Sequence, residues 1–391
     1  MRILYHHRTQ GEEPESVHIN AIVTALRRLG HEVDIIGPVS IEAVSRKRKA
    51  SFVGMIKRSA PRVIVEAGQI AYNIKSLVQL CRGLARKRYD FVYERYGIFN
   101  LAGLAAARLF HLPIVLEVNT LYAQAWDRYY GLTFRRVARA MEQFAVTRAD
   151  AIITVTGKMR ELLEMEGVNS HRITVAHNAI DPEEFHPGDE GRASIRKELN
   201  LRRFVAGFVG TMNRWQGVVG FAEVVEHVVA ERGDVGFLFI GDGEGRPALE
   251  SELRRRGVFN ATSFVGRKPH AEIPRFISAV DIGLLLDSNS YGSPMKIFEY
   301  WAMGKPVIAP GVPAVMEILR NGETGFVIQP GDARAMARRI LQLADDEALR
   351  EELGRAGRAR VLQNHTWEEN AQKILSAVAQ INPGRSAGER Q

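Results

Sequence analysis

The stretch DIGLLLDSNSYGSPMKIFEYWAMGKPVIAP, residues 281–310, reads as a strand, a loop, a helix and a second strand in immediate succession. DIGLLLD is a continuous apolar run, which is typical of a parallel strand buried on both faces. The residues after it predict a short helix with Ser293 as its cap and Pro294 at its first position, and Gly304 ends that helix. PVIA supplies the next strand. This order is a βαβ unit, so the stretch predicts a parallel α/β sheet.

The same alternation runs along the whole chain in two series. The first series of expected strands is ILYHH, HEVDIIG, FVYERY, PIVLEVN, DAIITVT and RITVAHNA, with helices from Ser16 and over residues 121–148 among those between them. The second series is FVAGFVG, VGFLFIG, ATSFVG, DIGLLLD, PVIAP and TGFVIQP. Between the two series, NAIDPEEFHPGDEG is rich in Pro, Gly and acids, which indicates a linker. We therefore expect two doubly wound, Rossmann-like α/β domains, residues 1–180 and 181–365, with ligand bound at the carboxyl ends of their strands.

Length and composition fit this organisation. A chain of 391 residues exceeds what one hydrophobic core usually organises, and its single cysteine, Cys81, excludes an internal disulfide framework. MRILYHHRTQ predicts a first strand and not a signal peptide, and no apolar run approaches the ~18 residues of a membrane-spanning helix. These features predict a cytoplasmic protein. A last helix follows over residues 366–382, and we expect disorder for the polar tail, residues 383–391.

Residues 46–88 form a basic segment. They contain twelve Lys or Arg and one acid, Glu66, so the segment carries +11 while the whole chain carries +8. Local positive charge indicates an anionic partner, either membrane headgroups or nucleic acid. Apolar residues are interleaved with the cations, which favours a helix on the anionic inner surface of a membrane over nucleic acid. A solvated helical face is the alternative.

Lys296 and Glu299 lie three residues apart on the helix of the opening stretch. The helix N-terminus and the Lys296 ammonium attract an anion, and the Glu299 carboxylate accepts hydroxyl hydrogen bonds. A phosphate beside a ribose diol would satisfy all three groups. The alternative is an exposed ion pair between residues i and i+3, which contributes a few tenths of a kcal/mol.

Two glycine-rich loops, GTMNRWQG and GDGEG, follow two other expected strands. Glycine lets a backbone approach a phosphate closely, although loops between strands and helices need glycine in any case. The spacing does not match a dinucleotide fingerprint, and the sequence contains no GKS or GKT phosphate loop.

Several motifs together resemble a known family. SPMKIFEYWAMGKPVIA, VDIGLLLD, RITVAHNAIDPEEFHP and HTWEENA in the second half, and VYERYGIF and LPIVLEVNT in the first, are similar to the retaining nucleotide-sugar glycosyltransferases of family 4, which have the GT-B fold. The resemblance implies that residues 181–365 bind a nucleoside-diphosphate sugar and that residues 1–180 bind the acceptor across a central cleft. It also implies that the last helix crosses back onto the first domain.

The resemblance assigns roles residue by residue. It implies catalytic roles for Lys296, Glu299 and Arg214, and acceptor-side roles for His18, Glu117 and Asn119. For Glu117, a structural hydrogen-bond acceptor is an equal alternative. The expected donor-binding residues are Gly210, Thr211, Asn213, Ser293, Pro294, Met295, Ile297, Gly241 and Arg267.

The chain departs from the family pattern at three positions. The family signature is a Glu, seven residues and a second Glu; Glu299 matches the second, but Tyr291 stands at the first. Two cations that grip the pyrophosphate in many members are replaced by Thr211 and Gln216. Lys296 and Arg214 are then the nearest positive charges for the leaving group.

The resemblance implies a metal-independent hexosyl transfer with no cofactor. The acceptor would be a glycan or a polyprenyl-linked sugar of surface polysaccharide or glycolipid synthesis. Two other hypotheses stay open: a nucleotide-sugar epimerase on the same fold, and a catalytically silent nucleotide-sugar-binding protein, for which Tyr291, Thr211 and Gln216 argue. Domain closure about residues 179–190 and the turn before the last helix would exclude water from the site.

Overall fold

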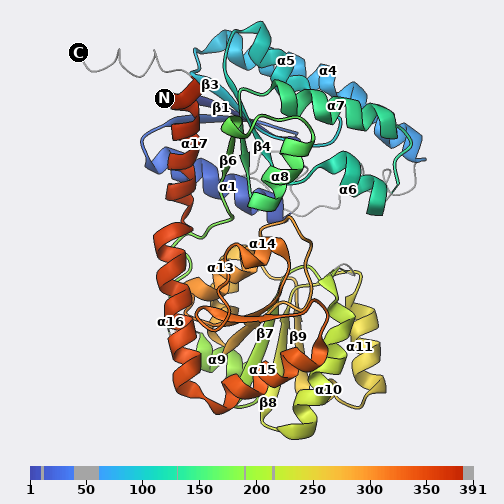
Figure 1. Ribbon diagram of the computed structural model, residues 1–391, viewed down its shortest axis with the longest axis vertical. Coiled ribbons are helices and arrows are strands. Elements are labelled where there is room, and N and C mark those ends of the chain that lie inside the picture. The colour runs from blue at the N-terminus through green and yellow to red at the C-terminus, as the bar shows by residue number, and fades with distance from the viewer. Residues whose placement is uncertain (10–12, 39–60, 130, 189–190, 214–215, 382–391) are drawn as a thin grey trace. The chain divides into compact units, whose positions relative to one another are not determined.

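The computed structural model describes residues 1–9, 13–38, 61–129, 131–188, 191–213 and 216–381 (Figure 1). The chain forms two compact units. Unit 1 comprises Met1–His177 and Trp367–Gln391, and unit 2 comprises Asn178–Thr366. Arg214, residues 46–60 of the basic segment and the polar tail lie outside the described residues.

Unit 1 is built on a parallel six-stranded sheet of order β2-β1-β3-β4-β5-β6. Its strands are β1 (Arg2–His6), β2 (Glu32–Ile36), β3 (Phe91–Arg95), β4 (Ile114–Val118), β5 (Ala151–Thr154) and β6 (Ile173–Val175). Its helices are α1 (Glu13–Arg28), α4 (Arg62–Arg86), α5 (Ala102–Leu109), α6 (Tyr122–Tyr129), α7 (Arg135–Arg148), α8 (Gly157–Met165) and α17 (Trp367–Ile381).

Helices pack on this sheet through alternate strand residues. Leu4, Val92 and Ile114 contact α4 and α5 in one apolar cluster. The C-terminal helix α17, red in Figure 1, packs against α1 and β5. Because strand side chains alternate between the two faces, the continuous apolar runs of the sequence are explained by helices on both of them.

Unit 2 contains a second parallel six-stranded sheet, of order β12-β11-β10-β7-β8-β9. Its strands are β7 (Phe204–Val209), β8 (Val235–Ile240), β9 (Thr262–Gly266), β10 (Ile282–Leu284), β11 (Val307–Pro310) and β12 (Gly325–Ile328). Its helices are α9 (Arg192–Glu198), α10 (Phe221–Glu231), α11 (Arg246–Arg255), α12 (Ile273–Ser278), α13 (Met295–Ala302), α14 (Pro313–Met316), α15 (Ala333–Asp345) and α16 (Glu347–Asn364), with the short turns η3 (Val218–Gly220) and η5 (His270–Glu272).

The two faces of the second sheet carry separate apolar clusters. Phe204, Ala206 and Phe208 of β7 pack with α10, α11 and α15, whereas Val205 and Val209 pack with α12, α13 and α14. The strand order places β10 between β7 and β11, so α13 of the opening stretch joins two adjacent strands. Two parallel sheets covered by helices confirm the predicted α/β class.

Three local predictions are wrong. The helix expected over residues 121–148 is two helices, α6 and α7. Gly131 interrupts the helical backbone with a φ of 73°. The Glu66 carboxylate then accepts hydrogen bonds from Thr133 N (2.9 Å) and Phe134 N (2.7 Å) just before α7. Helix α1 begins at Glu13 and not at Ser16. Helix α13 begins at Met295, after Pro294, and Ser293 does not cap it.

Candidate functional site

Three adjacent strands of unit 2 end in glycines with positive φ: Gly210 after β7, Gly241 after β8 and Gly266 at the end of β9. Gly241 N donates to Gly266 O at 2.9 Å, and Gly210 N donates to Ile240 O at 2.9 Å. A Cβ on Gly241 would collide with the carbonyl oxygen of Gly210. The glycines therefore let three backbones meet closely at the carboxyl edge of the sheet, where α/β proteins bind ligands.

Lys296 lies beside this edge. Its side chain is only 9% exposed, and its Nζ has no hydrogen-bond partner. A Cβ on Gly210 would lie 2.9 Å from Nζ, and the ring centroid of Phe208 is 4.2 Å away. Burial lowers the pKa of Lys296 from 10.5 to about 7, although the charge of Glu299 opposes that shift. Lys296 is thus a buried amine without a hydrogen-bond partner beside the glycine strand ends.

The N-terminus of α13 has no side-chain cap. Ser293, predicted as that cap, instead accepts a hydrogen bond from Asn178 N through Oγ (3.1 Å) and one from Asn178 Nδ2 through its carbonyl (2.6 Å). These bonds fix the entry to α13 without occupying its first amides. The positive end of the helix dipole therefore reinforces the charge of Lys296.

Glu299 lies one turn after Lys296 and is 7% exposed. His270, from η5, places its Nε2 3.6 Å from Glu299 Oε1, and its Nδ1 lies 2.9 Å from Glu184 Oε1. Burial by itself would lower the pKa of His270, but the hydrogen bond to Glu184 and the interaction with Glu299 outweigh it and raise the pKa to about 10. His270 is therefore a cation between two carboxylates.

The GTMNRWQG loop approaches the same edge. Met212 N donates to Asp242 O at 3.1 Å, and Asn213 Nδ2 donates to Thr211 Oγ1 at 3.2 Å. Gln216, which replaces a family cation, is 7% exposed, and its Oε1 has no partner. Arg214 lies outside the described residues, so its predicted role stays a prediction.

The other predicted donor-side residues divide by exposure. Arg267 is exposed just after β9, and Pro294 and Met295 are half-buried. The Ile297 side chain is fully buried in the core, and its N–H donates to Pro294 O at 3.2 Å. Its side chain therefore serves the core, its N–H is already paired, and the predicted donor contact of Ile297 stays a prediction.

The acceptor-side residues lie in unit 1 and centre on Glu117, which is 2% exposed. Its carboxylate contacts His18 Nε2 at 3.1 Å and accepts from Asn119 Nδ2 (2.7 Å), Tyr93 Oη (3.0 Å) and the Arg95 guanidinium. Burial would raise the pKa of Glu117, but the charges of His18 and Arg95 and the hydrogen bonds from His18 and Asn119 hold it well below its usual range. Glu117 therefore orients its neighbours.

His18 and Asn119 line the same small cavity in unit 1. The His18 ring meets the Trp367 ring edge-on at 4.9 Å, and a cavity of about 10 Å³ beside it holds no more than one water. A sugar ring cannot enter there. The Asn119 side chain is partly exposed, but its Oδ1 is buried without a hydrogen-bond partner and faces the same cavity. The acceptor-side roles of His18 and Asn119 therefore stay predictions.

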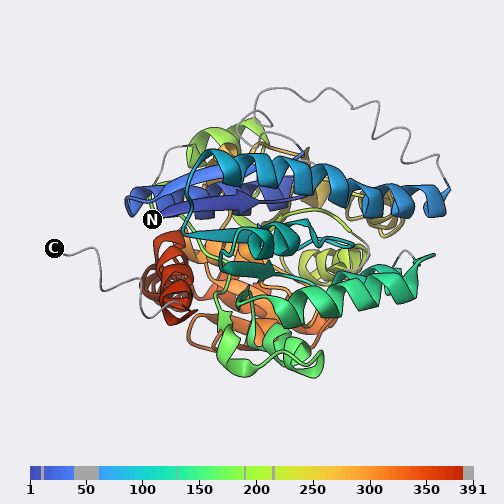
Figure 2. The ribbon, with the colours of Figure 1, turned by 90° about the horizontal axis from the view of Figure 1, so that it is seen from above.

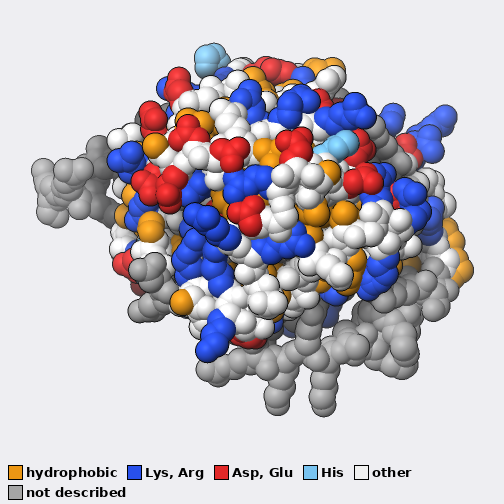
Figure 3. Space-filling model, turned by 90° about the horizontal axis from the view of Figure 1, so that it is seen from below, with side chains coloured by type: hydrophobic (Ala, Val, Ile, Leu, Met, Phe, Trp, Pro, Cys, Tyr) orange, Lys and Arg blue, Asp and Glu red, His pale blue; other side chains and the backbone are white. Residues whose placement is uncertain are grey.

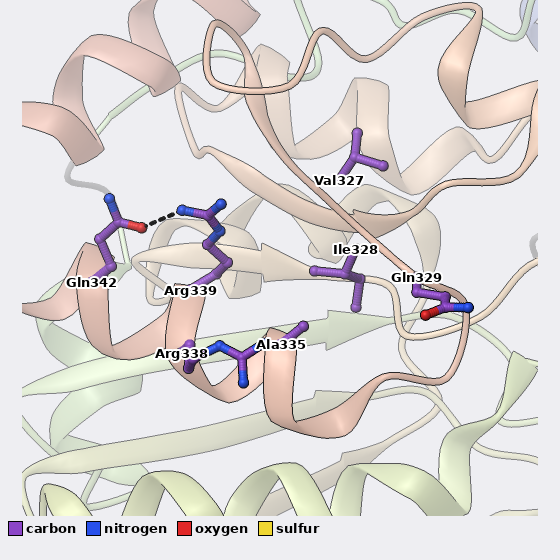
Figure 4. A pocket seen from close by; sticks show the side chains of 7 residues that line it. All are labelled: Val327, Ile328, Gln329, Ala335, Arg338, Arg339 and Gln342. Atoms are coloured by element: carbon purple, nitrogen blue, oxygen red, sulfur yellow. Dashed lines mark hydrogen bonds between the residues drawn. The ribbon is translucent and has the colours of Figure 1, made fainter.

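A larger hollow of about 480 Å³ lies between β12 and α15 (Figure 4). Arg339 donates to Gln342 Oε1 at 2.7 Å there, and its guanidinium carbon lies 4.2 Å from the Phe326 ring centroid. None of the predicted site residues lines this hollow. Within the described ranges, no three His, Cys, Asp or Glu side chains come together in a way that would hold a metal ion.

His270 and Glu184 were missed in the sequence. They lie 86 residues apart, and no spacing rule connects them. The available signal was the position of FVGRKPH, residues 264–270, since a loop that follows a strand of a parallel sheet lies at the ligand-binding edge.

Solved structures define the class. The crystal structure of Anabaena HepE in complex with UDP and glucose has a TM-score of 0.72 to this chain, with 17% identity over 97% of this chain and 99% of that one. Sucrose-phosphate synthase from Thermosynechococcus elongatus has a TM-score of 0.76, with 18% identity over 98% and 99% of the two chains. The fold is GT-B.

Two sequence families then match most of the chain between them. Residues 16–184 match the family described as Glycosyltransferase Family 4, and residues 203–346 match Glycosyl transferases group 1. An alpha-D-kanosaminyltransferase of Streptomyces kanamyceticus is 27% identical over 71% of this chain and 75% of its own length. A D-inositol 3-phosphate glycosyltransferase of Corynebacterium diphtheriae is 26% identical over 95% and 93%. The chain is a glycosyltransferase with these two family domains.

Proposed function

We propose that this glycosyltransferase moves a hexose from a nucleoside-diphosphate sugar to a hydroxyl of a glycan or lipid-linked acceptor, with retention, in surface polysaccharide or glycolipid synthesis. One observation carries the donor side: the Lys296 amine is buried without a partner beside the uncapped N-terminus of α13 and the glycine strand ends. A buried, unpaired amine costs folding free energy, and an anionic ligand removes that cost.

The proposed chemistry follows from where charge develops. Departure of the leaving group from the anomeric carbon builds negative charge on the diphosphate, and preorganised positive charge stabilises it. Lys296 supplies this charge, aided by the first amides of α13 and, in our prediction, by Arg214. The Glu299 carboxylate accepts hydrogen bonds from the ribose hydroxyls. The acceptor hydroxyl attacks from the face that the diphosphate leaves, its proton passes to a diphosphate oxygen, and no metal or cofactor takes part.

Similar proteins support the choice of substrates. The Anabaena structures contain UDP with glucose and UDP-glucose. An Escherichia coli relative, 26% identical over 71% of this chain, is named a UDP-Gal:alpha-D-GlcNAc-diphosphoundecaprenol alpha-1,3-galactosyltransferase. A uridine-diphosphate sugar and a lipid-linked acceptor are therefore the first substrates to test. In unit 1, His18, Glu117 and Asn119 are the proposed acceptor-side residues, and the Glu117 carboxylate contacts both of the others.

A lipid-linked acceptor requires contact with a membrane, and we propose that α4 and α7 of unit 1, both drawn in Figure 2, make this contact from the cytoplasmic side. The acid of α4, Glu66, and the acid of α7, Glu142, are both buried, so the exposed charges of these helices are positive. Exposed apolar residues lie among them: Val63, Ile64, Ile74 and Val78 on α4, and Val137 and Phe144 on α7.

On the face of the molecule drawn in Figure 3, acidic and basic side chains are interspersed, whereas the exposed charges of α4 and α7 are positive. Of the helices that the structure describes, none is long and apolar enough to cross a bilayer. The exposed cations and apolar residues of α4 and α7 are suited to the interface of an anionic membrane.

The donor is identified by thermal-shift measurements against UDP-, GDP-, ADP- and dTDP-sugars. A hit names the nucleotide, and incubation of that hit without acceptor separates transfer from epimerisation, because an epimerase would isomerise the sugar. Absence of any hit would contradict donor binding. A hit without transfer to any acceptor favours the silent binder, for which the neutral amide of buried Gln216 in place of a cation is the supporting observation.

Glu299→Ala tests the ribose role. We expect it to abolish donor turnover while the protein still unfolds cooperatively, although the loss of the contact with His270 lowers the thermal midpoint. Glu231→Ala, at an exposed position at the end of α10, is the matched control. Turnover by Glu299→Ala within about threefold of wild type would contradict the role, since losing hydrogen bonds to a charged group costs more than that.

A further inference from the structure

We infer that His270 is a positioning residue that aims the Glu299 carboxylate at the ribose hydroxyls of the donor and so sets the preference of the site for ribonucleotides over 2′-deoxyribonucleotides. This inference rests on the proposed function and adds a residue that lies outside the motifs on which the family resemblance rests.

The contacts of Glu299 carry the first step. Among the described residues, His270 is the one positively charged group within 4 Å of the Glu299 carboxylate, at 3.6 Å from Oε1. That distance suits an ion pair and is too long for a hydrogen bond. Glu299 is almost buried, so the ion pair between His270 and its Oε1 restricts the orientation of the carboxylate. The other oxygen, Oε2, then remains for the ligand.

The second step concerns what holds His270. Its Nδ1 is bonded to Glu184, which lies in the segment between the first strand series and α9, and its ring lies 5.4 Å from the Phe185 ring. Both ring nitrogens are thereby directed, Nδ1 toward Glu184 and Nε2 toward Glu299. The arrangement is the second layer of contacts that a precise binding group needs to keep its geometry.

The third step is chemical. A carboxylate that accepts from two vicinal hydroxyls discriminates against a ligand that lacks one of them, because the binding oxygen is then desolvated without a partner. This discrimination depends on the orientation of the carboxylate. If His270 sets that orientation, its removal reduces the ribose preference and leaves the diphosphate contact of Lys296 in place.

The test measures affinities of the full-length chain for three matched pairs, UDP with 2′-deoxy-UDP, GDP with 2′-deoxy-GDP and ADP with 2′-deoxy-ADP, and for inorganic pyrophosphate. For the pair that binds best, we expect wild type to favour the ribonucleotide by about tenfold or more. His270→Gln should reduce this ratio below about threefold while pyrophosphate affinity changes by less than about twofold. Glu184→Gln, at a side chain 36% exposed, should reduce it in the same direction without threatening the core.

Two controls separate positioning from general damage. His227→Gln removes another His–Glu pair, the 3.3 Å contact with Glu223 on α10, and should leave the ratio unchanged. In a Glu299→Gln background, His270→Gln should add no further loss, because residues that act through one another are not additive.

The outcomes are distinct. An unchanged ribose ratio in both His270→Gln and Glu184→Gln would overturn the inference while the proposed function stands. A loss of pyrophosphate affinity equal to the loss of nucleotide affinity would also overturn it. Failure of wild type to bind any of the nucleotides would overturn the proposed function and this inference with it.

Discussion

At the scale of single residues, Lys296 has the most unusual environment of the predicted site. A lysine ammonium in water keeps its charge until well above neutral pH, whereas burial against Phe208 and Gly210 brings the pKa of Lys296 to about 7. A bound diphosphate would favour the charged form and raise the pKa again. Donor binding is then coupled to uptake of a proton.

We therefore expect donor affinity to fall as the pH rises above about 7, by up to about tenfold per pH unit, because binding must add a proton to an increasingly neutral amine. A nucleoside-diphosphate sugar is the suitable ligand, since its diphosphate does not titrate in this range. Calorimetry in buffers of different ionisation enthalpy measures the proton directly.

Lys296→Met should remove most of the affinity and all of the proton uptake. Lys305 provides the matched control: burial lowers its pKa to about 8, but it contacts Ser278 O at 3.5 Å and no group of the sheet edge. Lys305→Met should retain the pH dependence of donor binding. Proton uptake that persists in Lys296→Met, or disappears in Lys305→Met, would refute this assignment.

Lys296→Met should also stabilise the ligand-free protein. The pKa of Lys296 in the folded state is below its value of 10.5 in the unfolded chain, so the unfolded state binds more protons between pH 7 and 10.5, and the cost of burial grows as the pH falls through that window. Below about pH 7 this cost reaches a few kcal/mol. Lys296→Met should raise the thermal midpoint by about 4 °C or more at pH 6, and less at pH 9.

Lys197→Met on exposed α9 serves as the control and should leave the midpoint within about 1 °C, because surface substitutions change stability little. A lower midpoint for Lys296→Met than for wild type at pH 6 would show that the amine is not an unpaired charge. Loss of activity with a gain in stability is the behaviour expected of a binding group kept at a cost to the fold.

Residue types alone placed Lys296 and Glu299 near one another on a short helix, but they did not predict the surroundings of either side chain. The pair was visible because both lie on one short helix after a buried strand. The partners of Glu299 come from segments far along the chain, and Ser293 was predicted to cap α13 because its bond to Asn178, 115 residues away, leaves no local trace. Long-range hydrogen bonds decide such details, and sequence spacing does not report them.

At the scale of elements, α4 and α7 are the helices for which we propose a membrane contact. Their N-terminal ends are linked through Glu66, which accepts from Thr133 N and Phe134 N. The carboxylate that joins them is thereby removed from the surface. Cations and apolar side chains make up much of what these helices expose.

We expect the full chain to sediment with vesicles that contain anionic lipid, and the bound fraction to fall with salt, because screening weakens the electrostatic part of the attraction. Arg82→Gln and Arg86→Gln should each reduce the partition coefficient by about fivefold, which corresponds to the ~1 kcal/mol that one cation contributes near such a surface. Ile74→Glu, at a side chain 71% exposed, should reduce it further by opposing apolar insertion.

Met316→Glu is the control for an exposed apolar residue of unit 2, since its side chain is 55% exposed on α14. It should sediment like wild type. Equal binding to neutral and anionic vesicles would remove the electrostatic part of the proposal, and no loss in Ile74→Glu would remove the apolar part.

At the scale of the whole molecule, strand and helix order was predictable because it follows from apolar periodicity. The six expected strands of each half are present, and the structure confirms the α/β class. The break between α6 and α7 was not predictable from periodicity alone, because the Glu66 carboxylate that accepts hydrogen bonds just before α7 comes from α4, far along the chain. The roles assigned to the two halves stay predictions.

The way unit 1 is assembled leads to a last prediction. Its sheet and most of its helices come from Met1–His177, but its covering helix α17 comes from the other end of the chain, after all of unit 2. Helix α17 buries Trp367, Ala371, Ile374, Ala377 and Val378 in this unit, and its Asn370 Nδ2 donates to His177 O at 2.7 Å. Each fully buried large apolar side chain contributes about 1.5–3 kcal/mol, so without α17 the unit loses an amount comparable to the whole stability of a domain.

We expect a fragment of residues 1–177 to be unstable and to bind a dye for exposed apolar surface. A fragment of residues 178–366, which is continuous in sequence and has its own core, should fold alone with a cooperative thermal transition. Adding a peptide of residues 367–391 should restore cooperative unfolding to residues 1–177, whereas the same peptide with Trp367→Ala and Ile374→Ala should not. A cooperative transition of 1–177 without any peptide would show that α17 is dispensable for unit 1, because its burial would then contribute less than the margin by which the sheet is stable.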